Sequence, residues 1–164
     1  MNSPANVSLA DLIAALEARA RAANNLAELG FSMANDSYNL LAFRQALVFV
    51  GDDQDARLLT VSGLAKPTED SPYLLWLRRS WPWLAQQLTA APGWLVPPAE
   101  GEGSDIPAGV LDGWQEWWPQ GVFGLPIQTR SGQPLGCICF LLDQPPNQLQ
   151  VQALNQLRQT WAYC

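Results

Sequence analysis

Hydrophobic residues near the C-terminal end of the chain alternate in a way that predicts two β-strands. Residues 122–129 form the first strand, and a turn containing Gly132 and Pro134 separates it from a second strand at residues 135–142. Apolar residues occupy both alternating sets of positions in the second strand, so both of its faces must be covered. We therefore expect this strand to lie in the middle of a sheet.

A helical period replaces the alternation after the second strand. Asn147 can act as the N-cap, and the apolar residues Val151, Leu154, Leu157 and Trp161 fall on one stripe of the helix that follows. The pattern predicts a C-terminal helix that packs on a sheet or on another helix.

The N-terminal part of the chain predicts two helices and a hairpin. A long helix covers about residues 8–29 and ends at Gly30, and a shorter helix follows at residues 32–43. Two strands come next, at residues 45–50 and 57–63, and an acidic turn joins them. This order of elements indicates a mixed α and β architecture.

The middle of the chain predicts a third helix and a long irregular segment. The helix opens at Ser71, which is followed by a proline, and Pro82 should kink or split it near Ser80. Residues 90–120 contain five prolines and five glycines, with one short strand expected at residues 94–96. A segment of this kind inside a domain is either functional or mobile.

Composition and charge limit the class of function. A chain of 164 residues with 48% hydrophobic residues can bury one core, so we expect a single domain over residues 1–164. The net charge of -6, with Lys66 as the single lysine, argues against a nucleic-acid partner. The sequence has no histidine, which removes imidazole catalysis and the usual zinc sites. We therefore expect no enzyme activity, no metal and no cofactor.

The terminal residues and the cysteines indicate where in the cell the protein is located and whether the chain is part of a longer protein. The first residues lack the basic and apolar regions of a secretory signal, and no run of about 18 apolar residues could span a bilayer. Three cysteines, two of them one residue apart in a buried strand, do not indicate a disulfide framework. We expect a cytoplasmic location. The apolar stripe of the last helix continues towards Cys164 without a terminator, so we also expect a fragment of a longer protein.

The C-terminal hairpin carries a resemblance to a known family. Leu-Pro-Ile at residues 125–127, Gly-Gln-Pro-Leu-Gly-Cys-Ile-Cys-Phe-Leu at residues 132–141 and the helix after them resemble the closing unit of a GAF domain. The resemblance implies an α+β fold with a central antiparallel sheet. The N-terminal and C-terminal helices would cover one face, and the Trp-rich helix and loop segment would cover the other face as the roof of a ligand cavity.

The middle of the chain is similar to a narrower group of proteins. Residues 43–49, 61–65 and 71–77 are similar to the GAF-like region ahead of the membrane span in some bacterial hemolysin-secretion-type membrane-fusion proteins, the adaptors of secretion and efflux pumps. This resemblance implies that the chain is the cytoplasmic head of an inner-membrane protein. Its partners would then include the secretion or efflux machinery.

Eight tryptophans are the outlier of the composition, and seven of them fall between residues 76 and 118. Such a cluster could line a pocket for a flat or aliphatic ligand or for a cation, or it could fill the core beneath an irregular loop. Cys137 and Cys139 could act as a redox pair, although we favour small core residues. The candidate ligand-binding residues are Trp76, Trp81, Trp94, Trp117, Trp118, Phe123, Cys137 and Cys139.

The sequence contains one candidate arginine but none of the residue sets that act in characterised GAF domains. Arg44, beside the first predicted strand, either holds a carboxylate or ties the chain down, and we favour the tie. The chain lacks the Asn-Lys-Phe-Asp-Glu set of cyclic-nucleotide-binding GAF domains, the Cys-His pair that holds a bilin and the loop cysteines of free-methionine-sulfoxide reductases. No active-site residue carries over from the family.

The resemblance also implies self-association, because the first and last helices of GAF proteins often pair between subunits. We expect a homodimer whose interface contains Leu9, Leu12, Leu16, Leu154, Leu157 and Trp161. The sequence thus predicts a non-catalytic regulatory or sensory domain that binds a small molecule, mediates dimerisation or does both. The alternatives are a structural scaffold without a ligand and, last, a cysteine-dependent redox enzyme.

Overall fold

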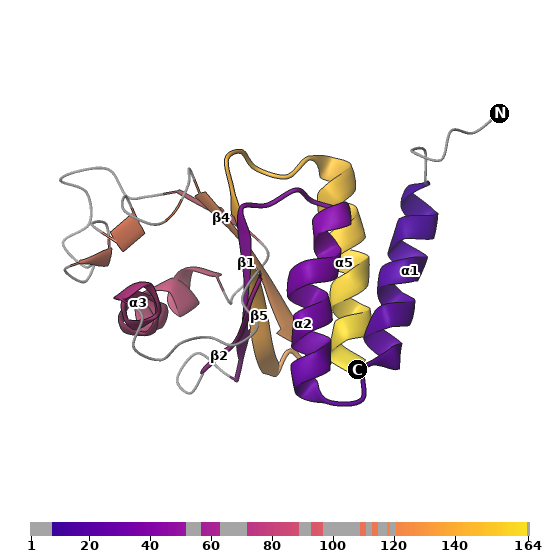
Figure 1. Cartoon of the computed structure of the whole chain (residues 1–164), viewed down its shortest axis with the longest axis horizontal. Helices are drawn as coiled ribbons and strands as arrows, with labels where there is room; N and C mark the ends of the chain where they lie inside the picture. The colour runs from indigo at the N-terminus through magenta and orange to yellow at the C-terminus, as the bar shows by residue number, and fades with distance from the viewer. Residues whose placement is uncertain are drawn as a thin grey trace.

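The chain forms a five-stranded sheet with helices on both faces (Figure 1). The computed structural model describes residues 8–51, 57–62, 72–88, 93–96, 109–110, 113–114, 118 and 121–163. The main elements follow in the order α1 (Leu9–Ala22), α2 (Leu26–Asp36), the 3-10 helix η1 (Ser37–Asn39), β1 (Gln45–Val50), β2 (Arg57–Val61), α3 (Pro72–Leu88), β3 (Gly93–Leu95), β4 (Gly121–Gln128), β5 (Pro134–Leu142) and α5 (Gln148–Tyr163).

β5 is the central strand of the sheet. The strand order is β2-β1-β5-β4-β3, and every neighbouring pair is antiparallel. Ile138 and Phe140 of β5 enter the core cluster that contains α2 and α5, whereas Cys137, Cys139 and Leu141 enter the cluster under α3. Both faces of β5 are therefore covered, which confirms the prediction from its apolar pattern.

Three helices form the layer on one face of the sheet. α2 packs on β1 and β2, α5 packs on β4, and α1 lies outside them against α2 and α5 (Figure 1). The residues that α1 buries are Ile13, Leu16 and Ala20. They meet Leu154 and Leu157 of α5 in one core cluster. The N-terminal and C-terminal helices therefore share a face, as the resemblance implied.

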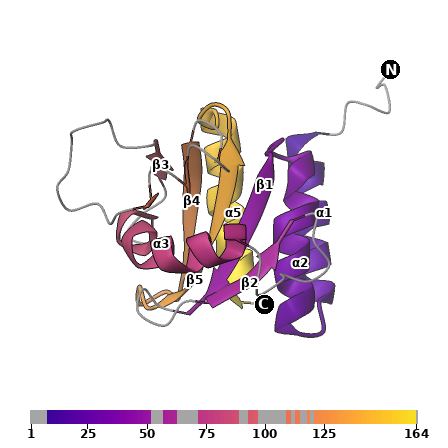
Figure 2. The ribbon, with the colours of Figure 1, turned by 60° about the vertical axis from the view of Figure 1, so that its left-hand side comes forward.

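The opposite face is covered by α3 and by residues between β3 and β4. Figure 2 shows α3 crossing in front of the strands, with α5 behind them. Leu77, Trp81 and Leu84 of α3 are buried together with Trp114 and Trp118. The predicted α+β fold is confirmed, with tryptophans opposite the terminal helices.

The long N-terminal helix predicted at residues 8–29 is wrong, because the chain leaves the helical conformation after α1. Ala23 is extended, with φ -64° and ψ 133°. Asn25 then caps α2 by accepting a hydrogen bond from the Glu28 N–H at 2.9 Å, while Glu28 Oε2 accepts from the Asn24 N–H at 2.8 Å. The Asn25 cap satisfies an N–H group that the first turn of α2 leaves unpaired, and Glu28 fixes the chain just before the helix.

Two further helix predictions are corrected. Residues 32–43 do not form a helix of their own, since α2 runs through the first part of this range and η1 follows it. α3 is not split near Ser80 but continues across Pro82. Pro82 lies on the exposed side of α3, while Trp81 and Leu84 are buried, so packing of the other side holds the helix together.

The strand predictions and the last helix cap agree with the structure. β1 has the predicted bounds, and β4 and β5 each begin one residue earlier than predicted. Asn147 Oδ1 accepts a hydrogen bond from the Gln150 N–H at 2.8 Å, and Gln150 Oε1 accepts from the Asn147 N–H at 2.9 Å, so Asn147 is confirmed as a cap. Residues 52–55 of the acidic turn lie outside the described residues. None of the described helices has the length and hydropathy to cross a membrane.

Candidate functional site

A hydrogen-bond network ties α3 to the sheet and to the segment that covers it. The Tyr73 hydroxyl donates to Gln45 Oε1 on β1 at 2.7 Å and accepts from Trp118 Nε1 at 2.9 Å. The Trp76 indole donates to the carbonyl oxygen of Gly109 at 2.9 Å. Burial raises the pKa of Tyr73, because a phenolate there would lose its solvation, although the Trp118 hydrogen bond opposes the shift. Tyr73 is therefore a neutral linker.

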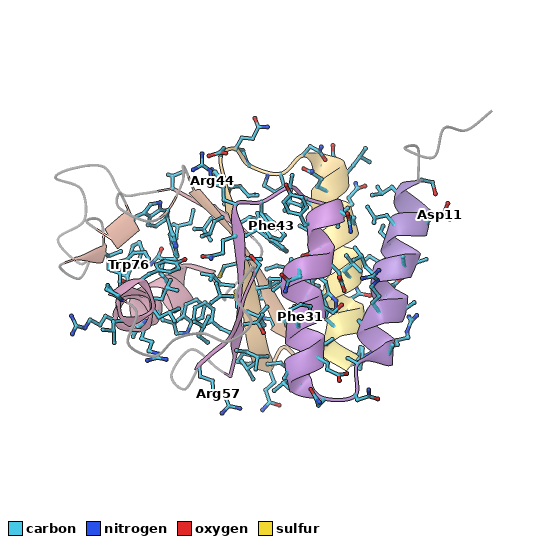
Figure 3. The ribbon with its side chains drawn as sticks, in the orientation of Figure 1. Asp11, Phe31, Phe43, Arg44, Arg57 and Trp76 are labelled. Carbon is cyan, nitrogen blue, oxygen red and sulfur yellow. The ribbon has the colours of Figure 1, made fainter. Side chains whose placement is uncertain are left out.

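Aromatic rings pack against one another in this layer. Trp81 stacks on Phe49 of β1 with 3.6 Å between ring centroids and 9° between ring planes. Trp118 makes edge-on contacts with Trp76 at 4.8 Å and with Trp114 at 5.0 Å. Edge-on and stacked pairs add specific attraction to the burial of apolar area. The layer under α3 is therefore an aromatic platform with defined ring positions (Figure 3 labels Trp76 within it).

One polar group in this layer has no partner among the residues that the structure describes. Trp81 is only 5% exposed, and its indole N–H makes no hydrogen bond with any of them. An unpaired buried donor costs about 1–3 kcal/mol, so native proteins rarely keep one without a reason. The indole N–H of Trp81 is therefore a donor that could still accept a partner. We call Phe49, Tyr73, Trp76, Trp81 and Trp118 the aromatic site.

The two cysteines of β5 lie on the same face of the sheet, and both are buried free thiols. Their sulfur atoms are 3.8 Å apart, and both residues are about 1% exposed. The hydrogen bond with Cys137 and burial together raise the pKa of the Cys139 thiol well above its ordinary value. A protonated thiol is a weak nucleophile. Within the described residues, no group of three or more histidine, cysteine, aspartate or glutamate side chains could hold a metal ion.

The fold of this chain is similar to the folds of several solved structures. No family model and no curated protein matches the sequence. The chain is similar to the GAF domain of a phosphoenolpyruvate-protein phosphotransferase from Coxiella burnetii, with a TM-score of 0.64 and 16% identity over 98% of this chain and 94% of that chain. The GAF domain of an Acinetobacter phosphoenolpyruvate-protein phosphotransferase gives 0.61 and 12%, over 99% and 93%. The fold is that of a GAF domain.

Photosensory proteins also share the GAF fold of this chain. The chromophore-binding domain of Stigmatella aurantiaca phytochrome P1 matches with a TM-score of 0.60 and 16% identity. The match covers 98% of this chain but 60% of the phytochrome chain, so this chain spans a little over half the length of that neighbour. None of these neighbours supports the resemblance to secretion adaptors, which stays a prediction.

The GAF sheet divides the predicted ligand-binding residues between its two faces. The members that lie together in the cluster under α3 are Trp76, Trp81, Trp118, Cys137 and Cys139. Whether they bind a ligand stays a prediction. Trp117 lies outside the described residues. Sequence reasoning missed Phe49 and Tyr73 of the aromatic site, although Tyr73 precedes Trp76 by three residues and so shares its side of α3.

The placement of Trp94 and Phe123 in the same site is wrong. Trp94 of β3 pairs with Phe123 of β4, which pairs in turn with Phe140 of β5. Cross-strand partners point to the same face of a sheet, and Phe140 belongs to the cluster on the side of α2 and α5. Both residues therefore pack on the side away from α3, where Phe43 also lies (Figure 3).

Most of the residues predicted for a dimer interface lie in the core of a single chain. Leu16, Leu154, Leu157 and Trp161 are core residues between α1, α5 and the sheet. Of the α1 stripe, Leu9 is exposed and Leu12 is half-buried. Leu16, Leu154, Leu157 and Trp161 therefore join the helices of one protomer. The homodimer itself stays a prediction.

Arg44 pairs with a carboxylate of its own chain. Its Nε and Nη2 atoms lie 3.1 Å and 2.9 Å from the two oxygens of Asp143, and both side chains are exposed. The pair joins the start of β1 to the end of β5, and Figure 3 shows Arg44 at that end of the sheet. Arg44 thus combines the two roles considered for it, because it holds a carboxylate and through it ties the chain down. An exposed pair of this kind contributes about 0–1 kcal/mol.

Proposed function

We propose that this chain is a non-catalytic regulatory domain that senses a small molecule at the aromatic site. The observation that carries the proposal is the indole N–H of Trp81, a residue of α3 that is 95% buried and whose N–H has no hydrogen-bond partner within the described part of the chain. A ligand acceptor placed against this N–H would recover a hydrogen bond that the protein alone leaves unmade. The GAF fold supports the proposal at the level of architecture, since the same fold occurs in the chromophore-binding domain of a phytochrome.

The chemistry of the site indicates the class of ligand. The rings of Phe49, Trp76 and Trp118 provide flat apolar surface, and Tyr73 is held neutral. A desolvated charge would find no counter-charge among these side chains, which makes a charged ligand costly. The ligand we propose is therefore neutral and flat, with a hydrogen-bond acceptor such as a carbonyl oxygen directed at Trp81.

The state of the titratable groups supports a role without catalysis. Catalytic acids, bases and nucleophiles work best when their pKa values lie near the operating pH. Here the pKa of Tyr73 and that of Cys139 are both raised away from neutrality, by burial and by the Cys137 contact. The groups that surround the aromatic site therefore hold their protons and serve to shape and fix the site.

Native mass spectrometry of freshly purified protein tests the proposal. The wild-type protein should carry a small molecule that Trp81→Phe loses, because phenylalanine keeps a ring against Phe49 and removes the N–H. Trp161→Phe is the matched control, since Trp161 is equally buried but lies in the cluster on the other face. It should retain the molecule. A bare wild-type protein, or equal retention by the two variants that remain folded, would contradict the proposal.

A further inference from the structure

A cleft lies away from the aromatic site, on the side of the sheet that α5 covers. It is formed by the turn between β4 and β5 and by the C-terminal part of α5, which lie at the same end of the molecule in both views (Figures 1 and 2). Its volume is about 430 Å³, and its charged and aromatic lining consists of Arg130, Arg158 and Tyr163. Thr129, Gln128 and Gln159 add polar groups. We call this the arginine cleft.

The two arginines of this cleft make no ion pair within the described part of the chain. Among the described residues, no carboxylate lines the cleft or pairs with Arg130 or Arg158. Other arginines of the chain do have such partners, as Arg19 does with Asp36 at 2.9 Å. The whole chain has a net charge of -6. The cleft therefore carries local positive charge in an acidic protein.

The walls of the cleft are fixed rather than free to collapse. The Thr129 N–H donates to the Gln133 carbonyl oxygen at 2.9 Å, and the Gly132 N–H donates to the Thr129 carbonyl oxygen at 2.9 Å. Gly132 has φ +87°, which suits glycine and closes the turn tightly. Arg130 lies over the Tyr163 ring, 5.5 Å from its centroid, so α5 holds this guanidinium by a cation–π contact.

We propose that the arginine cleft binds a small anion that carries a carboxylate or phosphate group. A guanidinium offers a planar fork of N–H donors that matches both groups, and stacking on Tyr163 leaves the edges of the Arg130 guanidinium available. Arg158 is half-buried on α5 and approaches the same space from the helix side. Gln159 adds a polar group at the rim of the cleft, and the Thr129 hydroxyl is held by Ser131 Oγ at 2.9 Å. The proposal is independent of the aromatic site.

The alternative role of these arginines is to stabilise the helix. The C-terminal end of α5 is the negative end of the helix dipole, and nearby cations are stabilising there. This role requires no ligand and no cleft. It predicts that loss of either positive charge lowers the stability of the domain, while added anions bind neither the wild-type protein nor the variants in a saturable way.

Titrations followed by nuclear magnetic resonance separate the two roles. We would add inorganic phosphate, pyrophosphate and citrate separately at low ionic strength and follow the Gly132 amide and the Nε–H signals of Arg130 and Arg158. At least one probe should shift these signals to saturation. Arg130→Gln and Arg158→Gln should each weaken that binding by about tenfold or more, the loss expected for one charge-assisted hydrogen bond. Comparison of the phosphate and citrate titrations identifies the preferred anionic group.

Arg57→Gln is the matched control, because Arg57 is an exposed arginine on β2 whose loss changes the net charge equally. It should bind the probe as the wild-type protein does. Absence of a saturable shift with all three probes would overturn the proposal, as would equal weakening by the control. Wild-type affinity in a folded Arg158→Gln variant would overturn it as well. Arg158→Lys, which keeps the charge and loses the fork, should bind with intermediate affinity.

Discussion

Leu157→Ala tests whether the last helix belongs to the core of one chain or to an interface between two. Leu157 lies on α5 and is 0% exposed, inside the cluster formed with α1 and the sheet. The hydrophobic pattern alone is equally compatible with a surface stripe that pairs two subunits. The substitution removes apolar atoms without adding a polar group, so its effect reports burial directly.

The expected loss follows from complete burial. Truncation of a buried leucine to alanine costs about 2–5 kcal/mol, and we expect about 3–4 kcal/mol because helices on one side and strands on the other limit collapse of the cavity. For a chain of this length each kcal/mol lowers the melting temperature by about 2–4 °C, which gives a fall of about 6–16 °C. A wild-type stability of about 5–15 kcal/mol leaves the variant folded.

Urea unfolding followed by circular dichroism at several protein concentrations measures this loss. Leu149→Ala is the control on the same helix, because Leu149 is 63% exposed, and it should change stability by less than about 0.5 kcal/mol. If Leu157 lay at a subunit interface, the measured stability of the protein would depend on protein concentration, whereas the stability of a single-chain core would not. A Leu157→Ala variant as stable as Leu149→Ala, or a concentration-dependent loss, would refute the placement of α5 in the core.

Three further predictions test other parts of the structure. Gly136→Ala should lower the free energy of unfolding by about 3 kcal/mol, because the added Cβ would lie 2.3 Å from the Phe49 carbonyl oxygen of β1. Gly132→Ala should lower it by about 1 kcal/mol, because the space around Gly132 is open but its φ is +87°. Equal unfolding free energies for the two variants would contradict this. In a Cys164→Ser background, Cys137 and Cys139 should resist a thiol reagent until denaturant is added, since both are buried. Rapid native labelling would show that β5 is exposed. Because the pKa of Tyr73 is raised in the folded protein, only the unfolded state loses this proton as the pH rises past its ordinary pKa of 10.0. The stability of the protein should therefore fall above pH 10.0. In urea unfolding measured at several pH values, Tyr73→Phe should remove part of that fall.

Local patterns predicted the parts of the fold that depend on neighbouring residues. The apolar residues on both sides of β5 indicated a central strand, and Asn147 indicated a helix start, because both signals lie within a few positions of the sequence. The break between α1 and α2 was missed although Asn25 and Glu28 carry a local capping signal. The alanine-rich sequence around it favours helix on both sides and obscured that signal.

The candidate site could be predicted in composition but not in arrangement. The tryptophans between residues 76 and 118 predicted a Trp-rich layer, and Trp76, Trp81, Trp114 and Trp118 do lie together in the cluster under α3. Trp94 was assigned to the wrong face, because its direction depends on the register of β3 with β4, which no local pattern sets. The bond between Tyr73 and Gln45 joins residues far apart in the chain, and the unpaired N–H of Trp81 is visible only once every neighbouring acceptor has been placed.

The most direct test of the proposed sensor role is the indole N–H signal of Trp81 in the nuclear magnetic resonance spectrum of freshly purified protein. Trp81→Phe assigns the signal, and Trp161 on the opposite face serves as the internal reference. We predict that unfolding the protein, removing small molecules and refolding it will move the Trp81 signal upfield, as the hydrogen bond to the ligand is lost, and leave the Trp161 signal in place. A Trp81 signal that is identical before and after this treatment would contradict ligand binding at the aromatic site.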